Sequence, residues 1–235
     1  VAYRGKAYRV FGTKRRPIPA AAKGGAFVED AMGRWHIVFR VEEESPAAPH
    51  GGEVGIDLGL KALATLSDGR VVENPRHLRA YAERLAVAQR AGNKRRARAI
   101  HMKIANTRRD FHHKLSTGLA RDYALIAVGN VNAQRLAKTR MAKSVLDAGW
   151  SAFRNMLRYK SPGFVEVDER FTTQTCSSCG CLPPERPRGI AGLGIRAWDC
   201  SECGASHDRD VNAARNILKL GRSVAAHADE SRRAA

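Results

Sequence analysis

The sequence predicts an α/β domain built on a mixed β-sheet, with a small metal-binding ribbon inserted before its last helix. Three short apolar segments between residues 53 and 73 are separated by tight turns, which is typical of antiparallel strands. Two later apolar segments, 124–128 and 164–171, each follow a helical segment, and this order favours strands reached through crossovers. Two Cys-x-x-Cys pairs, at 176–179 and 200–203, indicate the ribbon.

The composition favours a polyanionic partner. The chain has 235 residues, with 41 Lys and Arg against 23 Asp and Glu, and a formal net charge of +18. This balance favours binding to nucleic acid, although a ribosomal or merely soluble basic protein would share it. No apolar run approaches the roughly 18 residues that a membrane span requires, and no signal-peptide core is predicted near the first residue. Because that residue is Val1 rather than Met, we expect a fragment or an alternative start codon.

The first 50 residues are predicted to form a small β segment and a linker. A β-hairpin is predicted at 24–41, where Trp35, Ile37 and Phe39 occupy alternate positions. Residues 42–53 are rich in Glu, Pro and Gly and indicate a linker. We therefore place a domain boundary near residue 50.

The strands that follow carry a candidate acid. Val54, Ile56 and Leu58 share one face of the first strand, so Asp57 points to the other face. An Asp-Gly turn separates the next two strands. The pattern predicts three successive antiparallel strands.

A long basic helical segment comes next, at 75–123. Between Arg84 and Arg121 there are 11 Lys and Arg and one acid, Asp110. Such a face is often only solvated, but a segment this one-sided is better explained by contacts with phosphates.

The remaining elements complete the order of a known domain type. They are a buried strand at 124–128, a helix at 147–160 that starts at Asp147, a strand at 164–171, a helix at 207–220, and a disordered tail at 222–235. Three meandering strands followed by two strands reached through helices form a mixed sheet, which is the order of an RNase H-like domain.

Four cysteines are predicted to bind zinc. Twenty residues separate the pair Cys176 and Cys179 from the pair Cys200 and Cys203, a spacing typical of zinc ribbons. Four thiolates close the coordination sphere, so we expect a structural rather than a catalytic zinc. Cys181 is interpreted as a bystander. The odd number of cysteines favours metal over disulfides and a reducing cytoplasm.

Three arginines lie between the two cysteine pairs, and we expect that they could offer phosphate contacts. They are Arg186, Arg188 and Arg196.

Asp57 and Asp210 are candidate ligands for a second metal. An acid in a central strand is costly unless it is solvated, paired or bound to metal, and Asp57 could also be a solvated residue of an edge strand. Asp210 could simply be a residue of the first helical turn. However, Asp208 is the better N-cap, and Asp210 would then face the sheet with Ala213 and Ile217.

Several ordered motifs resemble the TnpB family, the RNA-guided nucleases encoded by certain insertion sequences and related to the type V CRISPR effectors. They are GIDLGLKALATLSDG, LAKTRMAKSVLDAGWSAFRNML, the paired Cys-x-x-Cys and HDRDVNAARNIL, between about Gly52 and Leu218. The resemblance implies a RuvC-like nuclease domain, a guide RNA made from the transposon end, and cleavage of double-stranded DNA with Mg²⁺ in a bacterial or archaeal cytoplasm. It implies that Asp57 and Asp210 are the first and third catalytic acids.

The chain departs from the family pattern in length. The family usually has a long N-terminal half, so we expect an N-terminally truncated chain whose hairpin at 24–41 resembles the end of a wedge domain. The predicted domains are a wedge-like segment at 1–50, the first part of a RuvC-like domain at 51–171, a zinc ribbon at 172–206, the last RuvC-like helix at 207–221, and the tail at 222–235.

The second departure removes a catalytic acid. Where the family usually has Glu-Asp-Leu-Asn, this chain has Gly-Asn-Val-Asn from Gly129. The strand 164–171 should lie beside 124–128, so its C-terminal end should meet the edge at which Gly129 lies. We therefore hypothesise that Glu169 replaces the missing acid, with Asp57 and Asp210, as a magnesium ligand.

Other interpretations of these acids stay open. Glu169 could instead pair with Arg170 or Arg154. Glu166 and Asp168 are weaker replacements, because they share the opposite face of the strand.

The predicted function is RNA-guided, metal-dependent cleavage of DNA. The predicted nucleic-acid contacts are Arg95, Arg96, Arg98, Lys103, Arg108, Arg109, Lys138, Arg140 and Lys143. The alternatives are a nuclease-inactive protein that binds DNA through its guide, an inactive truncated remnant, and a basic zinc-ribbon protein without enzyme activity.

Overall fold

The computed structural model describes residues 2–3, 5–8, 20–42, 51–188 and 191–233. The chain divides into a smaller unit, formed by residues 1–47 and 82–103, and a larger unit, formed by residues 48–81 and 104–235. None of the helices within the described residues is long and apolar enough to cross a membrane.

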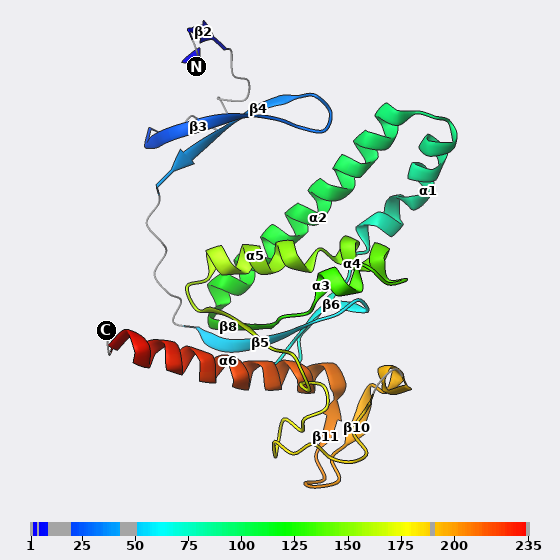
Figure 1. Ribbon diagram of the computed structural model, residues 1–235, viewed down its shortest axis with the longest axis vertical. Coiled ribbons are helices and arrows are strands. Elements are labelled where there is room, and N and C mark those ends of the chain that lie inside the picture. Colours follow the sequence, from blue (N-terminus) through cyan, green and yellow to red (C-terminus); the bar gives the residue numbers. More distant parts are fainter. Residues whose placement is uncertain (1, 4, 9–19, 43–50, 189–190, 234–235) are drawn as a thin grey trace. The chain divides into compact units, whose positions relative to one another are not determined.

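The smaller unit contains the predicted hairpin. β3 (Ala22–Glu29) pairs antiparallel with β4 (Trp35–Val41), which confirms the hairpin expected at 24–41 (Figure 1). A shorter antiparallel pair, β1 (Ala2–Tyr3) and β2 (Lys6–Ala7), was not predicted. Of the predicted linker, residues 43–50 lie outside the described residues.

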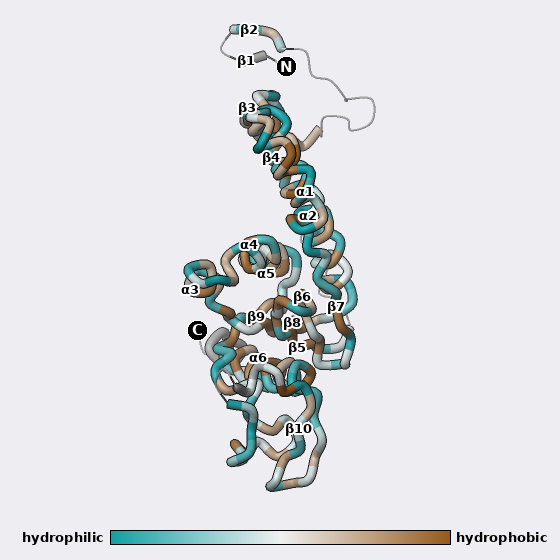
Figure 2. Tube along the Cα trace, turned by 90° about the vertical axis from the view of Figure 1, so that its right-hand side faces the viewer, coloured by the Kyte–Doolittle hydropathy of each residue, from teal (hydrophilic) through white to brown (hydrophobic). Residues whose placement is uncertain are grey.

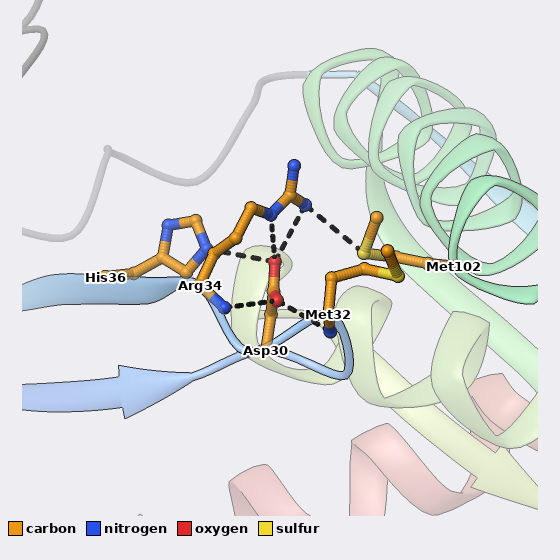
Figure 3. Close-up of polar contacts among 5 residues, drawn as sticks. All are labelled: Asp30, Met32, Arg34, His36 and Met102. Carbon is orange, nitrogen blue, oxygen red and sulfur yellow. Dashed lines mark hydrogen bonds and ion pairs between the residues drawn. The ribbon is translucent and has the colours of Figure 1, made fainter. Parts of the chain in front are cut away.

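The Asp30 carboxylate organises the turn between β3 and β4 (Figure 3). Its Oδ1 accepts hydrogen bonds from the backbone N–H groups of Met32 at 2.8 Å and Arg34 at 3.0 Å. Its Oδ2 accepts one from Arg34 Nε at 2.8 Å, and this contact holds the pKa of Asp30 well below its usual range. Arg34 Nη2 also lies 3.3 Å from the sulfur of Met102 on helix α2 (Lys94–Asp122). The turn is therefore fixed by side-chain contacts as well as by strand pairing.

The larger unit is built on a five-stranded mixed sheet. Its strands are β5 (Gly52–Leu58), β6 (Ala62–Leu66), β7 (Val71–Glu73), β8 (Tyr123–Gly129) and β9 (Phe164–Val167), in the spatial order β7-β6-β5-β8-β9. β5, β6 and β7 are antiparallel to one another in succession, whereas β8 is parallel to both β5 and β9. This topology confirms the predicted mixed sheet.

Helices cover both faces of this sheet. Besides α2, the α-helices within the described residues are α1 (His77–Arg90), α3 (Ala133–Leu136), α4 (Ala142–Ala148), α5 (Trp150–Lys160) and α6 (Arg209–Arg233), and a short 3-10 helix covers Ala191–Gly194. α5 lies over one face and α6 over the other (Figure 1). Ile56, Phe153 and Leu157 are fully buried between the sheet and α5. Ala127 and Ile217 are fully buried on the α6 side. Figure 2 shows the strands of the sheet between α5 and α6.

Two glycines allow α6 to approach the sheet closely. A Cβ at Gly55 would lie 2.0 Å from the Ala214 carbonyl oxygen, and a Cβ at Gly221 would lie 2.3 Å from the Ala127 Cβ. Side chains at these positions would push the helix away from β5 and β8.

The tail after residue 221 was predicted to be disordered, but α6 continues to Arg233. Gly221 is a packing residue within this helix, and one glycine in a helix costs only about 1 kcal/mol relative to alanine. The alanine-rich segment after Gly221 has high helix propensity.

Asp147 also differs from the prediction. The helix expected from Asp147 begins at Trp150, and Asp147 lies in the last turn of α4. Its two carboxylate oxygens each lie 2.9 Å from the backbone N–H of Leu78, at the start of α1. The prediction that Asp147 caps a helix N-terminus is therefore correct, but the helix that it caps is α1 and not the one that follows it in the sequence.

Smaller differences concern element boundaries. The helical segment 75–123 is two helices, α1 and α2, because the chain turns at Gly92, whose φ is +61°. The strand predicted at 164–171 ends at Val167. In the ribbon, β10 (Ala197–Asp199) pairs with β11 (Ser206–Asp208), so the last helix starts at Arg209 rather than at residue 207.

Candidate active site and metal centre

Strand register brings Asp57 and Gly129 to the same edge of the sheet. Ile56 is paired with Val128 in the parallel β5–β8 ladder, so Asp57 and Gly129 occupy the next position of each strand. Both residues face α6, because side chains alternate along a strand and Ile56 faces α5.

Glu169 reaches the same place from the neighbouring strand. Gly129 pairs with Val167 in the β8–β9 ladder, and Glu169 follows two residues later, on the same face as Val167. A Cβ at Gly129 would lie 3.1 Å from Glu169 Oε2 and 3.2 Å from Glu169 Cβ. The Glu169 side chain therefore fills the space above Gly129 that a longer residue there would need.

The turn after β9 holds Glu169 in this position. Its backbone N–H donates to Asn130 Oδ1 at 3.3 Å, and its carbonyl oxygen accepts a hydrogen bond from Thr172 Oγ1 at 2.8 Å. Thus Asn130, the residue after Gly129, connects the ends of β8 and β9.

Asp210 approaches the site from the start of α6. Asp208 caps this helix, since its Oδ1 accepts hydrogen bonds from the N–H groups of Asp210 at 3.0 Å and Val211 at 2.9 Å. This geometry agrees with the predicted roles of the two acids as cap and first-turn residue. Asp210 also forms an ion pair with Arg196, whose Nη1 lies 2.7 Å from its Oδ2.

The three acids interact electrostatically. Burial raises the pKa of Asp57 to about 8, and the negative charges of Asp210 and Glu169 contribute to this shift. Arg209 and Arg196 oppose it in part. Burial also raises the pKa of Glu169. Carboxylates crowded in this way are stabilised by a proton or by a cation, and oxygen donors of this kind suit Mg²⁺.

The arginines near Glu169 have other partners. Arg154 Nη1 lies 2.7 Å from Glu166, and Arg158 lies 2.6 Å from the same carboxylate. The Arg170 guanidinium lies over the Phe171 ring, 4.7 Å from its centroid. Within the described residues, Glu169 forms no ion pair with Arg154 or Arg170, although the positive charge of Arg154 partly offsets the rise in the pKa of Glu169.

Of the three predicted loop arginines, Arg196 is the one placed beside the acids. Arg186 donates to Gln174 at 3.1 Å and to the Pro183 carbonyl at 2.9 Å. Arg196 is fixed by its own carbonyl, which accepts the Arg209 N–H at 2.7 Å. The sequence could not show which of these arginines lies beside the acids, because their loop has no regular periodicity.

The four predicted cysteines gather into one cluster. The sulfur atoms of Cys176, Cys179, Cys200 and Cys203 lie within 4.8 Å of one another. Two of the separations are 3.7 and 3.8 Å, which match the edge of about 3.8 Å in a tetrahedron with metal–sulfur bonds of about 2.3 Å. The cluster could therefore hold a metal ion.

The pKa of one thiol in this cluster, that of Cys176, is lowered. Burial raises the pKa of Cys176, but hydrogen bonds from the Cys179 and Ser178 amides and from His207 outweigh it and hold the pKa below its usual range. Cys181 lies outside the cluster of four and is exposed.

Most of the predicted nucleic-acid contacts are exposed, and Arg108 is the exception. The exposed residues are Arg95, Arg96, Arg98 and Lys103 in the smaller unit, and Arg109, Lys138, Arg140 and Lys143 in the larger unit. Arg108 is half-buried, donates to the Leu146 carbonyl at 3.2 Å and lies 3.7 Å from Asp147. Its contacts are those of a structural residue.

Comparison with known proteins identifies the family. Residues 36–140 match a family profile described as "Probable transposase" (OrfB_IS605), and residues 150–217 match the "Cas12f1-like, TNB domain". A Streptomyces pristinaespiralis protein named "Putative RNA-guided DNA endonuclease" is 37% identical, over 91% of this chain and 57% of the relative. An Escherichia coli protein whose name begins with the same words is 31% identical, over 85% of this chain and 57% of the relative. A "TnpB-like" protein of Acanthamoeba polyphaga mimivirus is 34% identical, over 53% of this chain and 25% of the relative.

Solved structures share the fold. The chain superposes on the Cas12f1 protein of a cryo-EM Cas12f1–sgRNA–target DNA complex with a TM-score of 0.52 and 14% identity, over 80% of this chain and 54% of the other. A second Cas12f ternary complex gives a TM-score of 0.52 and 15% identity, over 79% of this chain and 42% of the other. The predicted RNase H-like, RuvC-like fold is thereby confirmed. The chain spans 57% of the length of the two bacterial relatives, and by these matches it belongs to the TnpB-like family of transposon-associated proteins.

Proposed function

We propose that the chain is a TnpB-like, RNA-guided DNA endonuclease whose catalytic acids are Asp57, Glu169 and Asp210. The observation that carries this proposal is the position of Glu169 above Gly129, where its Oε2 lies 3.1 Å from a Cβ built on that glycine. This is the face of the sheet that Asp57 shares and that α6 covers. The second acid is thus supplied from the turn after β9 instead of from the end of β8.

The donor set suits divalent metal ions. Bound Mg²⁺ would neutralise charge on the phosphate and activate the attacking water. Asp57 and Asp210 would provide two carboxylates, and Glu169 the third. The raised pKa of Asp57 supports this assignment, because a cation would offset the burial of this carboxylate and the negative charges of Asp210 and Glu169 that act on it. Arg196, paired with Asp210, is suited to contact the phosphate that is cleaved.

The four cysteines are proposed to bind a structural zinc. Zinc would brace the ribbon against α6, which the ribbon already contacts through buried hydrogen bonds. The Ser177 N–H donates to Asn212 Oδ1 at 2.8 Å, and Asn216 Nδ2 donates to the Thr175 carbonyl at 2.7 Å. These contacts join the first cysteine loop to the helix that carries Asp210.

The proposed partners are DNA and a guide RNA made from the transposon end. Two relatives carry the words "Putative RNA-guided DNA endonuclease" in their names, and one structural neighbour was solved with sgRNA and target DNA. The net charge of +18 supports polyanionic partners.

The test is cleavage of DNA by the purified chain, co-expressed with its flanking transposon-end RNA, in Mg²⁺. We expect cleavage by the wild type, and its loss in Asp57→Ala and in Glu169→Gln. Asp168→Asn is the matched control, because this exposed acid is adjacent in sequence and asparagine keeps the side-chain oxygen that accepts the Arg170 N–H. If Glu169→Gln cleaves like the wild type while Asp57→Ala is inactive, the assignment of Glu169 is wrong.

A guided DNA-binding protein without nuclease activity is the second candidate. It is favoured by one observation, the glycine at position 129 where the family usually has an acid. It predicts that the wild type binds RNA and a matching target without cleaving it, and that Asp57→Ala binds equally well.

A further inference from the structure

His207 contacts the cysteine cluster without being one of its four members. Its Nε2 lies 3.0 Å from Cys176 Sγ, and the residue is only 5% exposed. Its ring packs on Trp198, with centroids 4.8 Å apart. The imidazole is thereby aimed at one sulfur atom and held there by β10, the strand paired with its own.

The cluster requires hydrogen-bond donors once it holds zinc. Four thiolates and one Zn²⁺ together carry a charge of −2. Cys176 is fully buried and Cys200 is 1% exposed, so solvent contributes little to stabilising the charge on these two sulfur atoms, whereas Cys179 and Cys203 are exposed. The Cys179 N–H donates to Cys176 Sγ at 3.5 Å, an ordinary length for a hydrogen bond to sulfur. A side-chain N–H at 3.0 Å would add a further donor to the same sulfur atom.

His207 also connects this cluster to the proposed catalytic site. It lies in β11, directly before Asp208, which caps α6, and Asp210 follows in the first turn of that helix. A bond from His207 to a zinc ligand would fix this turn relative to the metal.

We propose that His207 is a positioning residue of the zinc site, whose Nε2–H donates a hydrogen bond to the Cys176 thiolate and secures the start of α6 to the cluster. The inference rests on the proposed zinc site and extends it beyond the four cysteines. It differs from a role as a metal ligand, in which the Nε2 lone pair would bind the ion and displace a thiolate.

The test compares zinc retention in the full chain and in three variants. His207→Phe keeps a ring against Trp198 but removes the donor, whereas His207→Gln keeps an N–H. Cys181→Ser is the control for a change beside the cluster. In competition with a chromogenic chelator, His207→Phe should lose at least about tenfold in zinc affinity, in the range found for residues that support metal ligands. His207→Gln and Cys181→Ser should stay near the wild type.

Two further measurements separate positioning from coordination. The cobalt-substituted wild type should show the absorption bands of four thiolates, and His207→Phe should keep them. Hydrogen exchange at residues 208–213 should be faster in zinc-loaded His207→Phe than in the wild type, because the anchor of this turn has been removed.

Several results would overturn the inference. Zinc affinity of His207→Phe equal to that of the wild type would exclude the bond, and so would His207→Gln behaving like His207→Phe. A wild-type cobalt spectrum of three thiolates and one imidazole would make His207 a ligand. A wild-type chain that binds no zinc would overturn the zinc site together with this inference, whereas the first two results would leave the zinc site intact.

Discussion

Adjacent strands of a sheet lie about 4.8 Å apart, so a carboxylate at the end of one strand can be replaced by one from its neighbour. At this site, the glycine on β8 leaves the space and Glu169, beyond β9, fills it. If Glu169 has the proposed role, the position of the charge relative to Asp57 is kept while its place in the sequence changes.

A reciprocal exchange tests this replacement at the level of single residues. Glu169→Ala should reduce cleavage by about a hundredfold or more, since even residues that only support metal ligands can cost that much. Adding Gly129→Glu to Glu169→Ala should restore part of the activity. Gly129→Glu alone should lower the cleavage rate. Its Cβ would lie 3.1 Å from Glu169 Oε2, and its carboxylate would add a like charge beside Glu169.

Cleavage rates of the four proteins at saturating Mg²⁺ form the double-mutant cycle that measures this coupling. Independent effects of the two substitutions, with no recovery in the double variant, would contradict the replacement.

A second prediction at the scale of single residues concerns the buried His112. Burial and the nearby Arg108 lower the pKa of His112 to about 4, and its ring, 2% exposed, packs against Phe153. The unfolded state therefore binds more protons than the folded state between about pH 6.5 and pH 4, so acidification through this window should lower the free energy of unfolding. The full shift corresponds to about 3 kcal/mol.

The measurement is urea unfolding of the wild type and His112→Leu at pH 7, 5.5 and 4.5. His77, Arg108 and His113 are the charged or titrating groups that act on His112, and the raised pKa values of Asp57 and Glu169 have the opposite effect on stability. The informative quantity is therefore the difference in the free energy of unfolding between the wild type and His112→Leu at each pH. The wild type should lose more stability on acidification than the variant, and equal losses would contradict the neutral, buried state of His112.

At the scale of elements, the contact between α6 and β5 holds the proposed site together. Gly55→Ala should destabilise the larger unit, because the new Cβ would lie 2.0 Å from the Ala214 carbonyl. Overpacking of this kind costs about 1–3 kcal/mol. Gly52→Ala on the same strand is the control, since a Cβ there meets nothing within 4 Å.

Both variants can be compared by denaturant unfolding and by Mn²⁺ binding. Gly55→Ala should lower both the free energy of unfolding and the affinity for Mn²⁺, because the displaced helix carries Asp210. Gly52→Ala should change neither. A Gly55→Ala protein as stable as Gly52→Ala would show that α6 is not closely packed on β5.

The sequence predicted these elements where local chemistry determines structure. Strand alternation placed Asp57 opposite the apolar face of its strand and separated Glu169 from Glu166 and Asp168, and cysteine spacing predicted the cluster. The sequence-based predictions failed where a residue's contact partner is distant in the sequence. Asp147 was correctly associated with a helix start, but only the fold brings it to Leu78. Arg108 was predicted to contact phosphate, because nothing in the local pattern indicates that it contacts Leu146.

At the scale of the whole molecule, the net charge of +18 leaves open whether nucleic acid is bound at defined places or by diffuse attraction. The two possibilities differ in salt dependence. Each phosphate contact adds about 0.7–0.9 to the slope of log affinity against log salt concentration. Arg95, Arg96 and Arg98 are exposed at the start of α2 and are predicted to make such contacts.

Replacing these three arginines by glutamine should reduce the salt slope of guide-RNA binding by about 2 to 3, as expected for three lost contacts. The matched control removes the same charge from three basic residues already paired with acids: Lys114 with Asp110, Arg121 with Asp122, and Arg222 with Glu53. Because these side chains are paired, their loss should change the slope by less than about 1. Binding would be titrated at four or five salt concentrations. Equal changes in the two triple variants would mean that net charge, rather than the start of α2, governs the attraction of the RNA.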